Sequence, residues 1–134
     1  MLHVLLSVPM EQNNLKTIID TFPNVTFHVH PNNNNYNDLT VLSECEVFAT
    51  FGISFDTNIL NKMPKLRFLQ IFKAGVDNLP LKELQQRKVI VCNVRGIHRT
   101  PVSEFVFSCI LALAQNLFSF RQNQKARKWN RNLY

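Results

Sequence analysis

The sequence predicts an α/β fold in which about five parallel strands alternate with helices and are followed by one long apolar helix. Short runs rich in β-branched and aromatic residues alternate with segments whose apolar residues recur at helical spacing. Prolines or glycines separate most of these runs. Beyond Pro101, by contrast, neither residue occurs as far as Trp129, which predicts one continuous helix.

The first part of the chain predicts two strands with a helix between them. The apolar run 3–8 is expected to form a strand, and apolar residues recur at helical spacing over 11–21. Alternating β-forming residues at 25–30 predict the second strand. A proline and four asparagines at 31–35 follow, and we interpret them as a polar surface loop.

The middle of the chain predicts a third strand and a short helix. Residues 38–43 are compatible with a helical turn, and the run 46–51 predicts a strand that ends at Gly52. Asp56 or Thr57 can then cap a short helix, because both residue types accept hydrogen bonds from free helical N–H groups.

Two further strands complete the predicted sheet. The runs 67–72 and 89–93 are the fourth and fifth strands, and a helix over 79–87 lies between them with Leu81 and Leu84 on one face. Right-handed crossovers between five such strands favour the flavodoxin-like order 2-1-3-4-5.

The final helix is expected to be apolar on nearly all sides. Thr100 is the expected N-cap, Pro101 suits the first helical position, and Glu104 suits the first turn. The segment 101–120 carries large apolar side chains all around the helix axis: Val102, Phe105, Val106, Phe107, Ile110, Leu111, Leu113, Leu117, Phe118 and Phe120. Such a helix must be covered all round, which predicts contact with a second subunit or another domain.

Composition and charge restrict the class of protein. The chain of 134 residues has the size of one domain, and its 46% hydrophobic and 18% charged residues are ordinary for a globular protein. The net charge of +6 is concentrated in the last fourteen positions, which hold five basic residues: Arg121, Lys125, Arg127, Lys128 and Arg131. These residues complement a helix carboxyl end and accompany no nucleic-acid-binding module, so nucleic-acid binding is not expected.

The same data predict a cytoplasmic protein without a membrane span. No apolar run approaches the roughly 20 residues that cross a bilayer. The first residues lack a basic segment and a cleavage site, so no signal peptide is expected. Cys45, Cys92 and Cys109 are an odd number, are widely spaced, and predict neither a disulfide framework nor a metal site.

Motifs for catalysis are missing from the sequence. It contains no Ser/His/Asp arrangement, GxSxG elbow, Walker loop or HExxH motif, and no acidic or cysteine cluster accompanies His3, His28 or His30. With only three glycines, the chain cannot contain the GxGxxG loop that holds a dinucleotide. We therefore assign no catalytic residue and no metal ligand within this chain.

The three glycines each follow a predicted strand. Gly52, Gly75 and Gly96 follow the third, fourth and fifth strands, and ligands of open α/β sheets bind beyond the carboxyl ends of strands. Glycine lets backbone N–H groups approach an anion, and Lys73 adds positive charge beside Gly75 and Val76. Spacing alone leaves two interpretations open, an anion site or simple turns.

Several motifs in order resemble one enzyme family. A strand leads into Ala74-Gly75-Val76-Asp77, the next strand ends in Asn93, and Gly96 precedes the helix start Val102-Ser103-Glu104. This arrangement resembles the amino-terminal half of the D-isomer-specific 2-hydroxyacid dehydrogenases. Gln115, where an arginine is common, and Ser103, in place of the usual alanine, depart from the family pattern and bear on the subfamily.

The resemblance implies a substrate domain at 1–100 and a long interdomain or dimerisation helix with a basic tail at 101–134. It implies a small 2-hydroxy or 2-oxo acid as substrate, NAD or NADP as cofactor bound mainly by a dinucleotide domain absent from this chain, and a homodimer formed through 101–120. The family's catalytic histidine, arginine and glutamate belong to that other domain or its distal hinge. The chain alone is therefore expected to be inactive.

By the same resemblance, this chain supplies the substrate site. The Gly75 and Val76 amides, in the substrate-binding turn that begins at Ala74, would hold the substrate carboxylate. The Phe51-Gly52-Ile53 loop would form a wall of the pocket. Thr100 would lie near the nicotinamide. The alternative hypothesis is a flavodoxin-like interaction module that dimerises without catalysis. A receiver domain is disfavoured, because the third strand ends without a phosphorylatable aspartate.

Overall fold

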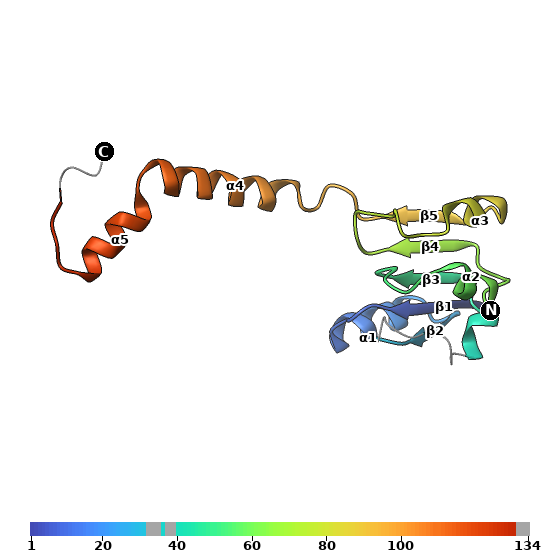
Figure 1. The fold of residues 1–134 in the computed structure, drawn as a ribbon. Helices are drawn as coiled ribbons and strands as arrows, with labels where there is room; N and C mark the ends of the chain where they lie inside the picture. The colour runs from blue at the N-terminus through green and yellow to red at the C-terminus, as the bar shows by residue number, and fades with distance from the viewer. Residues whose placement is uncertain (32–35, 37–39, 131–134) are drawn as a thin grey trace. The chain divides into compact units, whose positions relative to one another are not determined.

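The computed structural model describes residues 1–31, 36 and 40–130. The chain divides into two units, Met1–Arg95 and Gly96–Tyr134. The first holds the strands and the second holds two helices (Figure 1). The assignment of 1–100 and 101–134 as two domains stays a prediction.

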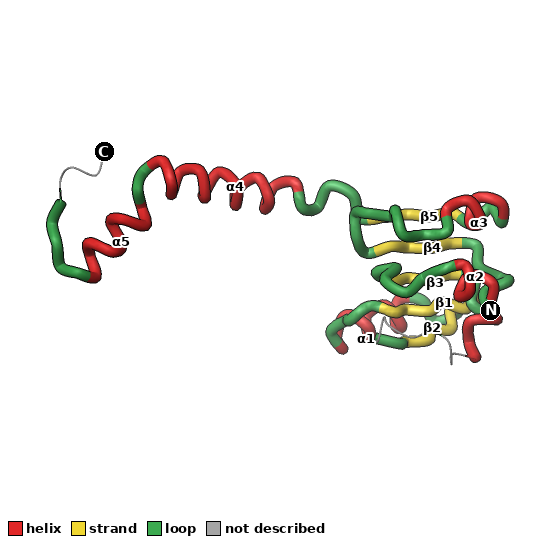
Figure 2. Tube along the Cα trace, in the orientation of Figure 1, coloured by secondary structure: helices red, strands yellow, loops and turns green. Residues whose placement is uncertain are grey.

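The first unit is built on a five-stranded parallel sheet with the order β2-β1-β3-β4-β5 (Figure 2). This order confirms the prediction from strand–helix alternation. Strand β1 is shifted by one residue from its predicted run, and the other four strands are slightly shorter than predicted: β1 Leu2–Ser7, β2 Val25–Val29, β3 Val47–Thr50, β4 Phe68–Ile71 and β5 Ile90–Asn93.

Short helices connect these strands: α1 Gln12–Thr21, the 3-10 turn η1 Thr40–Ser43, α2 Thr57–Asn61 and α3 Leu81–Gln86. Asp56, one of the two predicted caps, accepts a hydrogen bond from the Ile59 N–H at 2.9 Å. The prediction that Leu81 and Leu84 form an apolar face of α3 is confirmed for one of the two residues. Leu84 is buried, but Leu81 is 44% exposed.

The core lies on both faces of the sheet because alternate strand residues point to opposite sides. Leu5, Phe48 and Leu69 belong to the larger cluster, which also contains Leu60 of α2 and Leu84 of α3. The smaller cluster contains buried Val4, Leu6 and Ala49, and Leu15 of α1 packs against it. The helices α2 and α3 therefore cover one face, and α1 covers part of the other.

A pair of histidines joins β1 and β2. The Nδ1 atom of His3 lies 3.1 Å from the Nε2 atom of His28, and the two rings are stacked with centroids 5.3 Å apart. A hydrogen bond at this position requires that one of the two facing nitrogens carries no proton. Burial, and then the charge of His3, lower the pKa of His28 below its ordinary value.

This pair should make the stability of the first unit depend on pH. A lowered pKa means that the folded chain binds fewer protons than the unfolded chain, so this contribution is present above about pH 6.5 and is lost as the pH falls below it. We expect the melting temperature of His28→Asn to fall less than that of the wild type between pH 7.5 and pH 5. The control His98→Asn lies in the second unit and should follow the wild type. Parallel curves for all three proteins would contradict this assignment.

The second unit contains α4 Arg99–Ala114 and α5 Leu117–Lys125. The predicted N-cap is wrong. His98 occupies that position without a side-chain bond, and Thr100 and Pro101 lie within the first turn of α4. The single continuous helix is also wrong, because Asn116 adopts a left-handed φ of 51° and the two helices are bent by 62°. Asparagine tolerates this conformation better than most residues, so the helix ends without glycine or proline.

Within the second unit, the large apolar side chains of α4 are left uncovered. Phe105 is 69% exposed, Leu113 is 67% exposed, and no residue of α4 is buried. Within the described part of the chain, no single helix has the length and apolar character to cross a membrane. Only α4 and α5 taken together, with their bend, meet those two criteria.

Candidate functional site

Loops at the carboxyl ends of β3, β4 and β5 contain most of the predicted site residues. The loop after β3 begins at Phe51, the turn after β4 spans 72–77, and β5 ends at Asn93. The N–H of Phe72 donates to the carbonyl of Thr50 at 2.9 Å, which ties the start of the β4 turn to the end of β3. The parallel sheet therefore brings these segments to one edge.

Gly52 fits its place in the first loop because it has no side chain. It is buried and has a φ of +68°. A Cβ atom there would lie 3.1 Å from Cδ1 of Ile71 and 3.2 Å from Cδ2 of Leu79. Both the backbone conformation and the close packing therefore require glycine.

A series of hydrogen bonds between buried hydroxyl groups is connected to the backbone of the loop after β3. The N–H of Gly52 donates to Oγ1 of Thr50 at 3.0 Å, and the same oxygen lies 2.8 Å from the hydroxyl of Tyr36. Ser7 Oγ donates to the Tyr36 hydroxyl at 3.3 Å. Ser7, Tyr36 and Thr50 are each at most 1% exposed. We call these three side chains the hydroxyl network.

Sequence reasoning assigned no role to the hydroxyl network. Tyr36 follows the asparagine run at 32–35, which lies outside the described residues, and an isolated tyrosine after a polar loop has no distinctive pattern. The one available signal was the placement of polar Ser7 and Thr50 at the ends of apolar strands. Buried hydroxyls need hydrogen-bond partners, so such residues indicate a partner nearby.

Aromatic side chains line the two neighbouring loops. The rings of Phe51 and Phe72 meet edge to face with centroids 6.3 Å apart. Ile53, the other predicted wall residue, is 64% exposed. The structure therefore places apolar surface beside the β4 turn, and the assignment of Phe51, Gly52 and Ile53 to a substrate pocket stays a prediction.

The turn after β4 exposes the predicted anion-binding backbone. Ala74 and Gly75 are exposed, whereas Val76 is half-buried and packs against the larger core cluster. Gly75 is not among the residues with positive φ, and a Cβ atom there would meet only Oδ2 of Asp77, at 3.4 Å. The turn therefore does not require glycine for its conformation, and an absent side chain leaves the backbone accessible.

Two side-chain amides connect the ends of β4 and β5. Asn93 Nδ2 donates to the carbonyl of Ala74 at 2.6 Å. Gln70 Nε2 donates to the carbonyls of Ile71 and Cys92 at 3.2 and 3.4 Å. The sequence pattern singled out Asn93 only as a motif position, and its contact with the turn was not predicted.

The charges around the turn are of both signs, because Oδ2 of Asp77 lies 3.4 Å from the place of a Gly75 Cβ atom and Lys73 precedes the turn. Lys73 is half-buried and forms no ion pair with any residue that the structure describes. Thr100, the predicted cofactor contact, lies within α4 in the second unit, and its role stays a prediction. Among residues 1–31, 36 and 40–130, no three histidine, cysteine or acidic side chains are placed to hold a metal ion.

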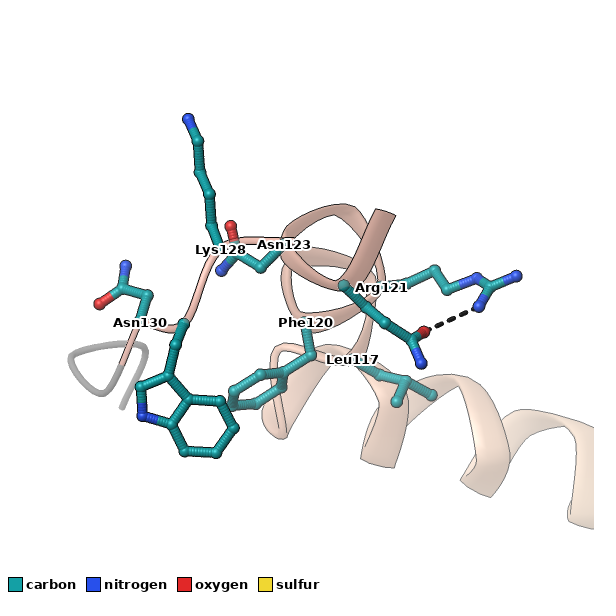
Figure 3. A pocket seen from close by; sticks show the side chains of 8 residues that line it. Leu117, Phe120, Arg121, Asn123, Lys128 and Asn130 are labelled. Atoms are coloured by element: carbon teal, nitrogen blue, oxygen red, sulfur yellow. Dashed lines mark hydrogen bonds between the residues drawn. The ribbon is translucent and has the colours of Figure 1, made fainter. Parts of the chain in front are cut away.

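A separate pocket lies within the second unit (Figure 3). It has a volume of about 710 Å³ and is lined by α5 and the residues that follow it, among them Leu117, Phe120 and Trp129. Arg121 Nη1 donates to Oε1 of Gln124 at 2.8 Å at its edge. None of the predicted site residues lines this pocket, and its apolar side chains offer no catalytic group.

Comparison with known proteins gives a consistent result. Residues 4–127 match the family described as "D-isomer specific 2-hydroxyacid dehydrogenase, catalytic domain". Glyoxylate/hydroxypyruvate reductase B of Escherichia fergusonii is 30% identical over 101 residues, which are 71% of this chain and 31% of that protein. The chain thus spans about a third of the length of the curated relatives it matches.

Solved structures extend the likeness to nearly the whole chain. Phosphoglycerate dehydrogenase from Lactobacillus plantarum is 29% identical with a TM-score of 0.56, and the match covers 96% of this chain and 40% of that one. D-lactate dehydrogenase from Aquifex aeolicus, solved with NAD and lactic acid, is 18% identical with a TM-score of 0.74, covering 97% and 39%. The second likeness concerns the fold alone.

Proposed function

Because this chain belongs to the D-isomer specific 2-hydroxyacid dehydrogenase family, we propose that it is the substrate-binding part of an NAD(P)-dependent oxidoreductase. The reaction would interconvert a D-2-hydroxy acid and a 2-oxo acid by hydride transfer. Family membership makes an oxidoreductase the favoured function over the alternative of a non-catalytic interaction module.

The observation that carries this proposal is the Ala74-Gly75-Val76 turn at the carboxyl end of a parallel sheet, in which Ala74 and Gly75 are exposed and Val76 is half-buried. Ligands of such sheets bind at this end. Backbone N–H groups that are fixed before binding recognise a carboxylate without a further ordering cost, and Lys73 adds positive charge nearby. The turn would therefore hold the carboxylate, and the apolar Phe51 and Ile53 would face the carbon chain of a small substrate.

The chemistry would be divided between this chain and the cofactor. A nicotinamide cofactor supplies or accepts the hydride at C2 of the substrate. The three glycines of this chain follow three different strands and cannot form the loop that holds a pyrophosphate, so its residues do not fit that part of the dinucleotide. We assign to this chain substrate binding, orientation and the exclusion of water, and no proton or hydride step.

The relatives suggest the size of the substrate. Glyoxylate, hydroxypyruvate and lactate in the names of the similar proteins are all small 2-oxo or 2-hydroxy acids. A small acid of this class is the substrate that we propose, in a cytoplasmic protein that binds neither nucleic acid nor membrane.

A glyoxylate titration followed by NMR tests the proposal. We expect the amide resonances of Gly75 and Val76 to shift with a Kd of about 1 mM, which corresponds to roughly 4 kcal/mol of binding free energy. Acetone, which has a carbonyl but no carboxylate, should produce no such shift. Unchanged Gly75 and Val76 resonances at saturating glyoxylate would contradict the proposed role of the turn.

We also propose that a second copy of the chain covers the apolar residues of 101–120. Contiguous exposed apolar surface of this kind marks an interface, and no residue of α4 is buried within one chain. Light scattering should then show a dimer, and a monodisperse monomer at high concentration would overturn this assembly.

A further inference from the structure

The turn that we assign to the carboxylate has few restraints of its own. The Phe72 N–H is bound to Thr50 on one side, and the Leu79 N–H is bound to the carbonyl of Val76 on the other. Between them, in the described part of the chain, the Asn93 amide makes the one side-chain hydrogen bond to the backbone of residues 73–75. The orientation of that backbone therefore depends on a residue from the neighbouring strand.

The position of this bond determines the direction of the Gly75 N–H. The carbonyl of Ala74 and the N–H of Gly75 belong to one planar peptide unit, and the described peptide bonds are all trans. In a trans unit the C=O and N–H point in opposite directions. Because Asn93 holds the carbonyl at 2.6 Å, the Gly75 N–H must point away from Asn93. Rotation of the peptide unit would break this bond and turn the N–H toward Asn93.

We propose that Asn93 is a positioning residue that orients the Gly75 N–H toward the substrate carboxylate. This inference rests on the proposed function of the turn. It adds the carboxyl end of β5 to a site that otherwise lies at the end of β4. Asn93 itself need not touch the substrate. Its place at the carboxyl end of β5, paired in register with Ile71 of β4, brings its amide beside the turn.

The neighbouring Gln70 provides a matched control. It is also a carboxamide between β4 and β5, but it donates to the carbonyls of Ile71 and Cys92, which do not belong to the peptide unit of Gly75. Loss of Gln70 removes one hydrogen bond to β5, at Cys92, and one within β4, at Ile71, without releasing that unit. A general loosening of the sheet edge would therefore affect both variants, whereas positioning of the N–H affects only Asn93.

The experiment compares Asn93→Leu, Asn93→His and Gln70→Met in the full chain by NMR. Asn93→Leu removes the donor at similar size and should change the Gly75 amide resonance before any ligand is added. Its Kd for glyoxylate should rise about tenfold, as expected for one lost hydrogen bond to a charged group. Asn93→His retains an N–H at Nδ1, the same number of bonds from the backbone, and should recover most of this loss. Gln70→Met should bind like the wild type.

The outcomes separate this inference from the function on which it rests. If the wild type shows no Gly75 response to glyoxylate, both the proposed function and the role of Asn93 fall. If the wild type responds and Asn93→Leu binds equally well, only the role of Asn93 falls. If Gln70→Met weakens binding as much as Asn93→Leu, Asn93 acts through sheet-edge stability, and positioning is also rejected.

Discussion

Gly52→Ala should lower the free energy of unfolding of the first unit by about 2–3 kcal/mol. Two costs add at this position. The left-handed φ of +68° is unfavourable for any residue with a Cβ atom, and that atom would lie within 3.2 Å of the buried side chains of Ile71 and Leu79. Both side chains belong to the larger core cluster, so each must shift against other buried side chains to make room.

Gly75→Ala is the matched control, since it makes the same chemical change in the adjacent turn. Gly75 has no positive φ and its Cβ would make one ordinary contact, so the loss should stay within about 0.5 kcal/mol. Urea unfolding followed by circular dichroism measures both values. Equal losses for the two variants would show that Gly52 is not held in the conformation described. A small loss for Gly75→Ala together with weakened glyoxylate binding would support a ligand-facing backbone there.

The strand order could be predicted because strand and helix signals alternate along the whole first unit. Each parallel pair needs a crossover, and the handedness of crossovers leaves few arrangements. The cap at Asp56 was also readable, because its side chain acts on an N–H three residues away. Such local and topological rules require no knowledge of distant contacts.

The features that sequence reasoning missed are of two kinds. Some depend on contacts between segments that are distant in sequence, and one depends on two backbone conformations of a single residue that differ little in energy. Tyr36 reaches Thr50 across fourteen positions of sequence, and Asn93 reaches Ala74 across nineteen. No periodicity reports such pairs. At Asn116 the break in the last helix depends on one residue adopting a left-handed conformation, and asparagine is also acceptable inside a helix.

Thr50→Val should cost the first unit about 2–4 kcal/mol although the two side chains have nearly the same shape. Valine cannot accept the hydrogen bond of the Gly52 N–H, and the Tyr36 hydroxyl loses a partner at 2.8 Å. Both groups stay buried, so water cannot replace the lost oxygen without rearrangement. Thr50→Ser keeps the oxygen and should cost less, chiefly through a lost methyl group. Urea midpoints that do not separate valine from serine would contradict a structural role for the hydroxyl.

A double-mutant cycle with Tyr36→Phe then tests whether the hydroxyl network acts as one unit. Thr50→Val leaves the Tyr36 hydroxyl with Ser7 alone among the network's side chains, whereas the double variant removes that hydroxyl as well. The free energy of unfolding of the double variant should therefore fall by about 1 kcal/mol less than the sum of the decreases in the two single variants. The Gly52 N–H stays unpaired in both variants that carry valine, so Tyr36→Phe cannot restore full stability. The hydrogen bond of the Gly52 N–H fixes the backbone of the loop after β3, so Thr50→Val should also shift the amide resonances of Phe51 and Ile53. Tyr36→Phe alone should shift these resonances less. Strict additivity of the two losses would mean that Tyr36 and Thr50 stabilise the unit independently, despite their 2.8 Å contact.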